Sequence, residues 1–563
     1  MTGDNFLISV ENLHIKFGGA APVTAVNNLS FQLRKGETLA IVGESGSGKS
    51  LTALALMGLL PNAATISGNI TLNVNEHVYS LAALTDKSQW QSLRGKEMGM
   101  IFQEPMTSLN PIMCVGKQLE EAIFAHQNVS KHQAKKLTLD WLQKVQLQHP
   151  EETYKRYPHQ LSGGQKQRIM IAMAMCNHPS LLIADEPTTS LDVTIQHEII
   201  QLMSYLQHEH NSAMIFITHD LSLAAAIADD TLVMYKGELM EYGETSQVLA
   251  KPQNPYTKAL LACKPSRTEK GKRLPVISDF LDIPEIPQAP LPERTHLNEE
   301  VSLHEPILSV NNLQVWFAGQ KNILGTPQNH FKAVNDVSFT LYKGEVLGLV
   351  GESGSGKSTL SRCLMGLTPV NDGAIIFDGR DISKLSPREW KPVRRRIQMI
   401  FQDPYSSLNP RMTIGDAIME AMLAHNIVEK AALQKETYRL LDLVNLSADS
   451  FHRYPHQFSG GQRQRVGIAR TLALKPQILL CDEIVSALDV SVQAQILNLL
   501  KDLQAELKLS YLFISHDLSI IHYISDRVMV MKAGKIIESG EAEEVFTKLQ
   551  NEYTRQLIDA TVK

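Results

Sequence analysis

The sequence is poor in cysteine and in the patterns that would use it. Its 563 residues include five cysteines, and no two of them form a C-x-x-C pair; they are Cys114, Cys176, Cys263, Cys363 and Cys481. An odd number at wide spacing excludes a disulfide framework and gives no ligand pattern for zinc or an iron–sulfur cluster. We therefore expect buried, reduced thiols in a cytosolic protein.

Long apolar runs and an excess of positive charge are also missing. No apolar run approaches the roughly 18 to 20 residues that span a bilayer. The N-terminal segment MTGDNFLISVENL lacks the basic and then apolar order of a signal peptide. Lys plus Arg is 54 and Asp plus Glu is 59, a net charge of −5, so nucleic-acid binding through bulk charge is not expected. If the protein works at a membrane, other chains must hold it there.

The chain contains a second copy of its own motifs. GESGSGKS occurs at residues 43–50 and again at 351–358, and RYPHQLSGGQKQR at 156–168 resembles RYPHQFSGGQRQR at 453–465. The segments IFQ, ADE or CDE, and FITHDLS or FISHDLS also occur twice, in the same order. The period is far too long for a solenoid. The repeat therefore predicts two whole domains of similar fold.

These repeats predict the division of the chain. We expect a first nucleotide-binding domain over residues 1–265, a linker over 266–305 and a second such domain over 306–563. Six of the 25 prolines fall between Pro265 and Pro292, so the linker cannot sustain a helix. It is interpreted either as an extended, semi-rigid tether or as a disordered connection. The first half is longer upstream of its IFQ segment, and we expect its extra residues to lengthen loops around 70–92.

The glycine-rich segments predict phosphate binding. Each follows a strand pattern and precedes a helix-forming run, which is the context that makes G-x-x-x-x-G-K-S a specific signal. The glycines let consecutive backbone N–H groups face a phosphate, and the helix N-terminus adds positive potential. Lys49 and Lys357 should reach the β- and γ-phosphates, and Ser50 and Ser358 should bind Mg²⁺.

Two apolar runs end in paired acids. SLLIADE and QILLCDE are typical of buried parallel strands, whose carboxyl ends hold ligands in α/β sheets. Asp185 and Asp482 would hold Mg²⁺, and Glu186 and Glu483 would polarise the attacking water. A solvated acidic turn is the alternative interpretation for either pair alone.

LSGGQ immediately before a helix, together with the motifs above, resembles the ATP-binding cassette (ABC) ATPases. The resemblance covers nearly everything outside the linker. It implies an α/β fold with two tandem P-loop ABC ATPase domains, each a RecA-like core with a helical subdomain at roughly 104–178 and 403–475. In this family two cassettes meet head to tail, and each ATP lies between the P-loop of one and the signature of the other.

The resemblance implies roles for particular residues. Gln103 and Gln402 would bind Mg²⁺ and sense a membrane partner, and His219 and His516 would contact the γ-phosphate. Asp192 and Asp489 would lie at the interface of the cassettes. The residues expected to bind ATP are Gly43, Glu44, Ser45, Gly46, Ser47, Gly48, Lys49, Ser50, Gly351, Glu352, Ser353, Gly354, Ser355, Gly356, Lys357, Ser358, Ser162, Gly163, Gly164, Gln165, Ser459, Gly460, Gly461 and Gln462.

Two departures from the family pattern stand out. The second signature begins with Phe458 where the first has Leu161, and Glu483 is followed by Ile484 where Glu186 is followed by a proline. Neither removes a charged group, so we expect both sites to hydrolyse ATP. Phe17 and Phe317 are candidates for stacking on adenine, with a place in the strand core as the alternative.

Further segments resemble the peptide/nickel importer branch of the family. They are QEPMTSLNPIMCVG, QDPYSSLNPRMTIGD, NPYTKALLACKP and NEYTRQLIDA. The resemblance implies an ATPase subunit that energises a bacterial importer for peptides or peptide-like solutes. Its partners would be two transmembrane permease subunits and a periplasmic binding protein, with no nucleic acid, and it would sit at the cytoplasmic face of the inner membrane. The alternative is a twin-cassette ATPase of the ribosome-associated type.

Overall fold

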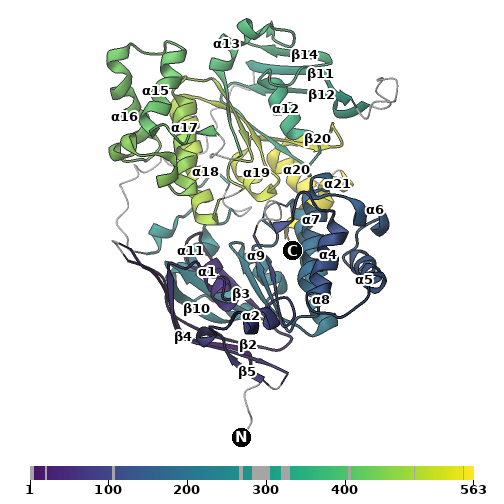
Figure 1. Cartoon of the computed structure of the whole chain (residues 1–563). Helices are drawn as coiled ribbons and strands as arrows, with labels where there is room; N and C mark the ends of the chain where they lie inside the picture. Colours follow the sequence, from purple (N-terminus) through teal and green to yellow (C-terminus); the bar gives the residue numbers. More distant parts are fainter. Residues whose placement is uncertain are drawn as a thin grey trace. The chain divides into compact units, whose positions relative to one another are not determined.

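The computed structural model describes residues 6–19, 22–75, 77–103, 108–189, 191–265, 270–281, 305–318, 330–402, 407–486, 488–548 and 551–562. They divide into two compact units. The first is drawn mainly from Met1–Leu261, and the second mainly from Pro284–Val562 together with Ala262–Val276. Figure 1 shows the elements of both, and the two units share one plan.

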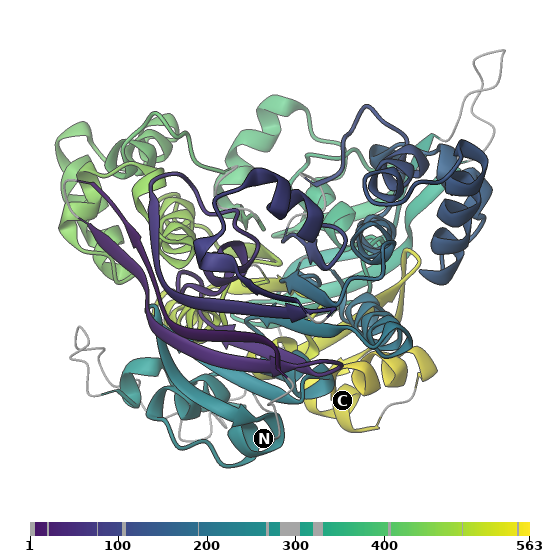
Figure 2. The ribbon, with the colours of Figure 1, turned by 60° about the horizontal axis from the view of Figure 1, so that its bottom comes forward.

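The first unit contains two sheets. A four-stranded antiparallel sheet has the order β2-β1-β4-β5, and a six-stranded sheet, parallel except for β10, has the order β10-β9-β3-β8-β7-β6. Figure 2 shows β1 and β2 side by side as long purple strands. The strands are β1 (Phe6–Phe17), β2 (Val23–Arg34), β3 (Thr38–Gly43), β4 (Ala64–Val74), β5 (His77–Ser80), β6 (Met98–Ile101), β7 (Leu181–Asp185), β8 (Ala213–Thr218), β9 (Asp230–Tyr235) and β10 (Glu238–Glu244).

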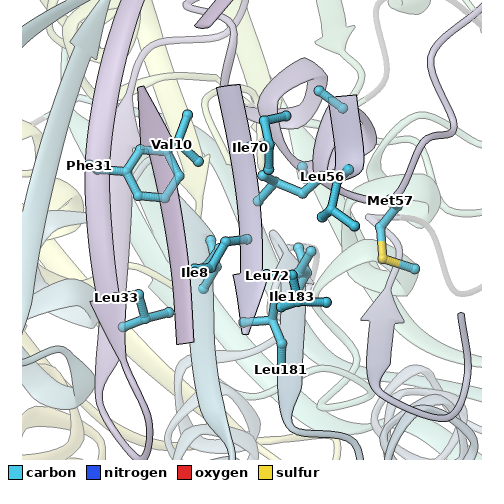
Figure 3. Packing of buried hydrophobic residues seen from close by; sticks show 14 of the residues in the cluster. Ile8, Val10, Phe31, Leu33, Leu56, Met57, Ile70, Leu72, Leu181 and Ile183 are labelled. Carbon is cyan, nitrogen blue, oxygen red and sulfur yellow. The ribbon is translucent and has the colours of Figure 1, made fainter. Parts of the chain in front are cut away.

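A hydrophobic core joins the two sheets of the first unit through α1 (Lys49–Leu56). Ile8 of β1, Ile70 of β4, Leu56 of α1 and Ile183 of β7 have no exposed surface and belong to one cluster (Figure 3). Burying each such side chain contributes on the order of 1.5–3 kcal/mol. The core therefore fixes the helix that follows the glycine-rich loop against the central sheet.

Helices form the rest of the first unit. Those after β6 are α4 (Val115–Phe124), α5 (Lys131–Lys144), α6 (Pro150–Lys155) and α7 (Gly163–Met175), and they make the predicted helical subdomain. Their apolar faces pack with β7 and β8 into a second cluster. The remaining helices are α2 (Lys87–Leu93), α8 (Val193–His210), α9 (Leu221–Ile227), α10 (Thr245–Ala250) and α11 (Pro255–Ala262).

The second unit repeats this topology. Its sheets have the orders β12-β11-β14-β15 and β16-β17-β18-β13-β19-β20. Its strands are β11 (Pro306–Ala318), β12 (His330–Tyr342), β13 (Val346–Val350), β14 (Asp372–Phe377), β15 (Arg380–Asp381), β16 (Ile397–Ile400), β17 (Ile478–Asp482), β18 (Ser510–Ile514), β19 (Arg527–Lys532) and β20 (Lys535–Glu541). Its helices include α12 (Lys357–Leu364), α13 (Pro387–Arg396), α15 (Ile414–Ala424), α16 (Leu433–Leu443), α17 (Gly460–Leu472), α18 (Val490–Leu507), α19 (Leu518–Ile524), α20 (Ala542–Lys548) and α21 (Glu552–Val562).

The predicted fold class is confirmed, and one detail differs. The extra residues of the first half lengthen a hairpin rather than a loop, because β4 has 11 residues and β5 has 4. Their counterparts β14 and β15 have 6 and 2. Within the described residues no helix combines the length and apolar character that crossing a membrane requires. All five cysteines are free thiols, and all except Cys114 are buried.

Candidate nucleotide-binding sites

The first glycine-rich loop connects β3 directly to the N-terminus of α1. Gly46 and Gly48 have φ angles of 79° and 100°, which side-chain-bearing residues rarely adopt. A Cβ atom at Gly48 would also lie 2.9 Å from the carbonyl oxygen of Ala25 and 2.9 Å from Cγ2 of Val26. The loop therefore needs glycine at position 48 for two reasons, its backbone angle and its close packing.

A buried lysine closes each loop. The Lys49 side chain is 4 % exposed, and its ammonium donates to the carbonyl oxygens of Gly43 and Glu44 at 2.8 Å each. In the second unit, the ammonium of Lys357 donates to the corresponding oxygens of Gly351 and Glu352 at 2.6 and 2.9 Å. Each lysine is thus held over its own loop at the start of a helix, where a phosphate would also be attracted.

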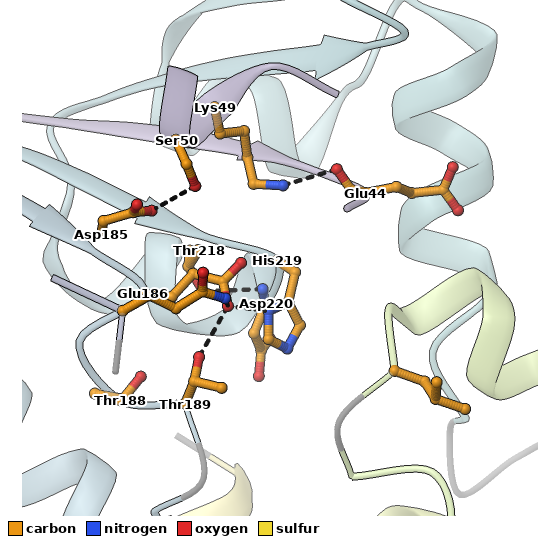
Figure 4. Close-up of polar contacts among 12 residues, drawn as sticks. Glu44, Lys49, Ser50, Asp185, Glu186, Thr188, Thr189, Thr218, His219 and Asp220 are labelled. Atoms are coloured by element: carbon orange, nitrogen blue, oxygen red, sulfur yellow. Dashed lines mark hydrogen bonds and ion pairs between the residues drawn. The ribbon is translucent and has the colours of Figure 1, made fainter. Parts of the chain in front are cut away.

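The end of β7 brings a carboxylate to the first loop. Ser50 Oγ donates to Asp185 Oδ1 at 3.0 Å (Figure 4). Burial raises the pKa of Asp185 to about 6, and the adjacent charge of Glu186 adds to the rise, while Ser50 and the Lys49 ammonium oppose it. The hydroxyl and carboxylate oxygens suit a hard cation such as Mg²⁺, and a cation here would offset the negative charge that burial disfavours.

Glu186 is the centre of a polar network. Its carboxylate accepts a hydrogen bond from Thr189 Oγ1 at 2.9 Å and lies 3.5 Å from His219 Nδ1 (Figure 4). It also accepts a hydrogen bond from Gln103 Nε2 at 3.1 Å. Burial pushes the pKa of this carboxyl up. The hydrogen bond and charge of His219, the Thr189 hydroxyl and the Lys49 charge outweigh burial and lower the pKa to about 2. Glu186 is therefore ionised at neutral pH.

The second unit assembles the same groups. Ser358 Oγ donates to Asp482 Oδ1 at 3.4 Å, and Gln402 Nε2 donates to Glu483 Oε2 at 3.0 Å. His516 Nδ1 lies 3.6 Å from the carboxylate of Glu483. Burial and the charge of Glu483 raise the pKa of Asp482. The pKa of Glu483 is lowered because His516 and the Lys357 charge outweigh its burial.

The two acids that follow the strand-end aspartates share an unusual backbone conformation. Glu186 and Glu483 have φ angles of 47° and 50°, in the left-handed region. A residue other than glycine pays of order 1–3 kcal/mol for such a conformation, which persists where the surrounding structure enforces it. Here the amide of each acid is bonded at 3.0 Å to the neighbouring strand, at Ile217 or Ile514. The turn places the Glu186 carboxylate beside His219 and the Glu483 carboxylate beside His516.

The two sites differ in two hydroxyl groups. In the second, Ser361 Oγ adds a bond of 3.5 Å to Asp482, where the first unit has an alanine. Thr189 binds the side chain of its acid, whereas its counterpart Ser486 donates to the backbone oxygen of Glu483 at 2.9 Å. Sequence reasoning missed Thr189. A hydroxyl residue three positions after each acid was the available signal.

The signature segments begin α7 and α17. Ser162 and Ser459 are the N-cap residues, and each forms a reciprocal capping box with the glutamine three positions later. A Cβ atom at Gly461 would lie 2.3 Å from Cγ1 of Val492, so this position must stay small. The first turns of both helices therefore present backbone at positions where a bulky side chain cannot be accommodated.

The family described as "ABC transporter" matches residues 26–189 and 334–486, more than half of the chain. The chain belongs to the ABC transporter family. Its two units are ABC cassettes, and the protein is an ABC-type ATPase that binds ATP. A second family, the C-terminal region of oligopeptide/dipeptide transporters, matches residues 240–285.

Individual relatives match nearly the whole chain. The glutathione import ATP-binding proteins GsiA of Escherichia coli strain K12 and of Shigella boydii are each 48 % identical over 562 residues, which is 98 % of this chain and 89 % of theirs. The predicted resemblance to a fused ABC subunit of the peptide/nickel importer branch is confirmed. Among solved structures, cbiO1 from Clostridium perfringens, part of the ABC transporter complex cbiONQ, covers 45 % of this chain and 94 % of its own, with 28 % identity and a TM-score of 0.38.

The two departures of the second cassette have structural counterparts. Phe458 is 4 % exposed, and the Arg453 guanidinium lies 4.3 Å from its ring centroid, a cation–π contact. Ile484 is buried and leaves the turn unchanged, since the bond from Ser486 N to Glu483 O has the same 3.2 Å length as its counterpart in the first cassette. Neither substitution disturbs the backbone of the site.

The candidate adenine-stacking residues are placed differently in the two cassettes. Phe17 is partly buried against the hydrophobic core of the first cassette. Phe317 is 46 % exposed. The core interpretation therefore fits Phe17, and only Phe317 leaves a large part of its ring free for a ligand.

Proposed function

We propose that the chain is the ATP-hydrolysing subunit of a bacterial ABC importer for peptides or peptide-like solutes. One observation carries the proposal: a region typical of oligopeptide/dipeptide transporters follows the first ABC region. Relatives named for glutathione import match the chain over nearly its full length. The ribosome-associated alternative has no such support and is set aside.

The glycine-rich loops are the proposed phosphate sites. Residues 43–50 and 351–358 would surround the β- and γ-phosphates with backbone N–H groups. The ammonium groups of Lys49 and Lys357 already lie over these loops, so they need only exchange carbonyl oxygens for phosphate oxygens. The buried ammonium group therefore has hydrogen-bond acceptors both before and after the exchange.

The donor set beside each loop suits Mg²⁺. Ser50, Asp185 and Gln103 would hold the ion in the first cassette, and Ser358, Asp482 and Gln402 are their counterparts in the second. When bound, the ion would offset negative charge on the phosphates. In this structure the side-chain amide of Gln103 donates to Glu186, so it would have to turn for its oxygen to reach the ion.

Glu186 and Glu483 are the proposed water-activating groups. An ionised carboxylate accepts a hydrogen bond from a water molecule. This hydrogen bond orients the lone pair of the water oxygen toward the γ-phosphate. Thr189 and the strained turn keep Glu186 in one orientation. His219 and His516 lie beside these carboxylates, from where they would contact the γ-phosphate. The proposal that each signature caps the nucleotide of the other cassette stays a prediction.

Membrane permease subunits are the partners that an importer ATPase implies. We propose two of them, with a periplasmic binding protein that delivers the solute, and a location at the cytoplasmic face of the inner membrane. The test is reconstitution of the chain with its permease subunits in vesicles. A solute-loaded binding protein should stimulate ATP hydrolysis, and the double variant Glu186→Gln/Glu483→Gln should not respond. The absence of stimulation by any peptide-loaded binding protein would contradict import.

A further inference from the structure

A segment of the predicted linker is bound to the second cassette. Residues 270–276, here called the strap, follow α11 in the chain and belong largely to the second compact unit. Leu274 and Val276 of the strap are 1 % and 3 % exposed. The strap is therefore an ordered element within a stretch whose proline content predicts only a tether.

The side chain of Asn498 in α18 forms two hydrogen bonds with the backbone of one strap residue, Leu274. Its side-chain oxygen accepts from the backbone N–H of Leu274 at 3.0 Å, and its side-chain nitrogen donates to the carbonyl oxygen of Leu274 at 2.9 Å. One amide thus satisfies both polar backbone groups of a buried residue, each of which would otherwise be costly to bury. A side-chain amide carries the donor and the acceptor that this pairing requires.

Neighbouring side chains add to the contact. The Tyr523 hydroxyl of α19 donates to the carbonyl oxygen of Lys272 at 2.8 Å, and lies 3.3 Å from the Asn498 side-chain oxygen. Arg273 pairs with Asp502 at 4.0 Å. The positive charge of Lys270 interacts with three carboxylates of the second cassette, those of Glu543, Asp526 and Glu541. A basic, extended segment thus meets an acidic, amide-bearing surface.

The first cassette has different residues at the equivalent positions. Asn498 is 2 % exposed, whereas its counterpart on α8, Gln201, is exposed and lies within hydrogen-bond distance of His197 in the same helix. Tyr523 corresponds to an exposed alanine, Ala226, and Asp502 corresponds to Tyr205, which is 59 % exposed. The binding groups are therefore specific to the second cassette and are not part of the shared fold.

We propose that the surface formed by Asn498, Tyr523 and Asp502 is a receptor for the strap, and that this docking anchors the region after the first cassette to the second cassette independently of nucleotide. The occupant is a segment of this same chain. Its consequence is that the covalent connection between the halves is held at the second cassette by hydrogen bonds as well as by the chain itself.

The proposal can be tested on the full chain with a cleavable linker. A site for a specific protease is inserted after Pro292, the folded protein is cut without nucleotide, and the fragments are run on a sizing column. We expect the two fragments of the otherwise unchanged protein to co-elute. Leu274→Asp on the strap and Asn498→Ala on α18 should each increase the dissociation constant of the fragments at least tenfold, and Gln201→Ala is the matched control.

Two readouts separate lost docking from lost folding. Leu274→Asp changes only the strap, so the uncut variant should keep the ATP turnover of the unchanged protein. Hydrogen exchange at the Leu274 amide should be slow in the unchanged chain and fast in Asn498→Ala. Co-elution of the cut Leu274→Asp fragments with unchanged affinity would overturn the proposal, and so would fast exchange at Leu274 in the unchanged protein.

Discussion

Thr189 donates a hydrogen bond of 2.9 Å to the carboxylate of Glu186, while its counterpart Ser486 donates to the backbone of Glu483. This hydroxyl holds the side chain of the acid in the first cassette, whereas the equivalent hydroxyl in the second cassette holds the turn that carries the acid. The same fold thus supports its two candidate hydrolytic groups in different ways.

This difference predicts unequal effects of removing the hydroxyls. A hydrogen bond to a charged group is worth about 1.5–3 kcal/mol, so Thr189→Ala should lower ATP turnover at the first site roughly tenfold by leaving Glu186 less well oriented. Ser486→Ala should change turnover less than twofold. Steady-state phosphate release measures both, and Thr189→Ser should restore activity. Equal losses in the two alanine variants would refute a positioning role for Thr189.

Both cassettes are expected to hydrolyse ATP. Glu186→Gln and Glu483→Gln should each reduce turnover strongly, because each removes an ionised carboxylate and leaves a neutral amide. The double variant should abolish it while retaining ATP binding. Single-turnover phosphate release, with nucleotide binding measured in parallel, checks this. Unchanged turnover in Glu186→Gln together with complete loss in Glu483→Gln would show that only the second site works.

Alanine substitutions at two glycines of the first loop should separate the stability cost of backbone strain from that of close packing. Gly46 and Gly48 both have positive φ, but a Cβ atom meets open space at Gly46 and two atoms at 2.9 Å at Gly48. Gly46→Ala should therefore cost about 1–3 kcal/mol from its backbone alone. Gly48→Ala should cost on the order of 1–3 kcal/mol more, from overpacking. Calorimetric melting of the full chain compares them, and equal shifts would mean that the contacts at Gly48 relax freely.

A histidine pair should make the first cassette sensitive to acid. His178 Nδ1 and His210 Nδ1 lie 3.1 Å apart beside the ring of Trp141. Burial lowers the pKa of both, with the Lys144 charge adding to the effect at His178 and the charge of His178 adding to it at His210, while Glu209 opposes it at each. Since the unfolded chain keeps the ordinary value of 6.5, it binds more protons below that pH, and stability falls as the pH drops through and below 6.5.

The second cassette supplies the test of this sensitivity, since it has Lys475 and Leu507 at the equivalent positions. His210→Leu should flatten the fall in the melting temperature of the first cassette between about pH 7.5 and pH 5. The melting temperature of each cassette is measured separately, by following hydrogen exchange at its amides as the protein is heated. A variant whose melting temperature falls as steeply as that of the unchanged protein would remove the pair as the cause.

The repeated motifs made most of the fold predictable. Strand, glycine loop and helix occur where GESGSGKS indicates them, and the paired acids end β7 and β17 as the apolar runs predict. Each of these features is specified by residues within one short segment, so the sequence of that segment is enough to predict it. The resemblance to a known family then supplied the helical subdomain, which no short motif specifies.

Contacts between distant segments that lie outside the repeated motifs were not predictable. Leu274 and Asn498 are separated by 224 positions, and neither the proline content of the linker nor the sequence of α18 indicates that they meet. The length of the β4–β5 hairpin was misjudged as loop because alternation in NITLNV is short and bounded by polar residues. Thr189 escaped notice because its role depends on a turn whose backbone angles the sequence does not specify.

The left-handed turn at Glu186 and Glu483 sets a limit on engineering. Glycine or asparagine would relieve the strain at either position, so selection for heat resistance alone should favour exchanges there. Each such exchange would remove the carboxylate that is proposed to activate water. At these two residues, a change that raises thermal stability should therefore lower ATP turnover. In a variant library screened by melting temperature, we expect hydrolysis to be lost first through changes at Glu186 and Glu483.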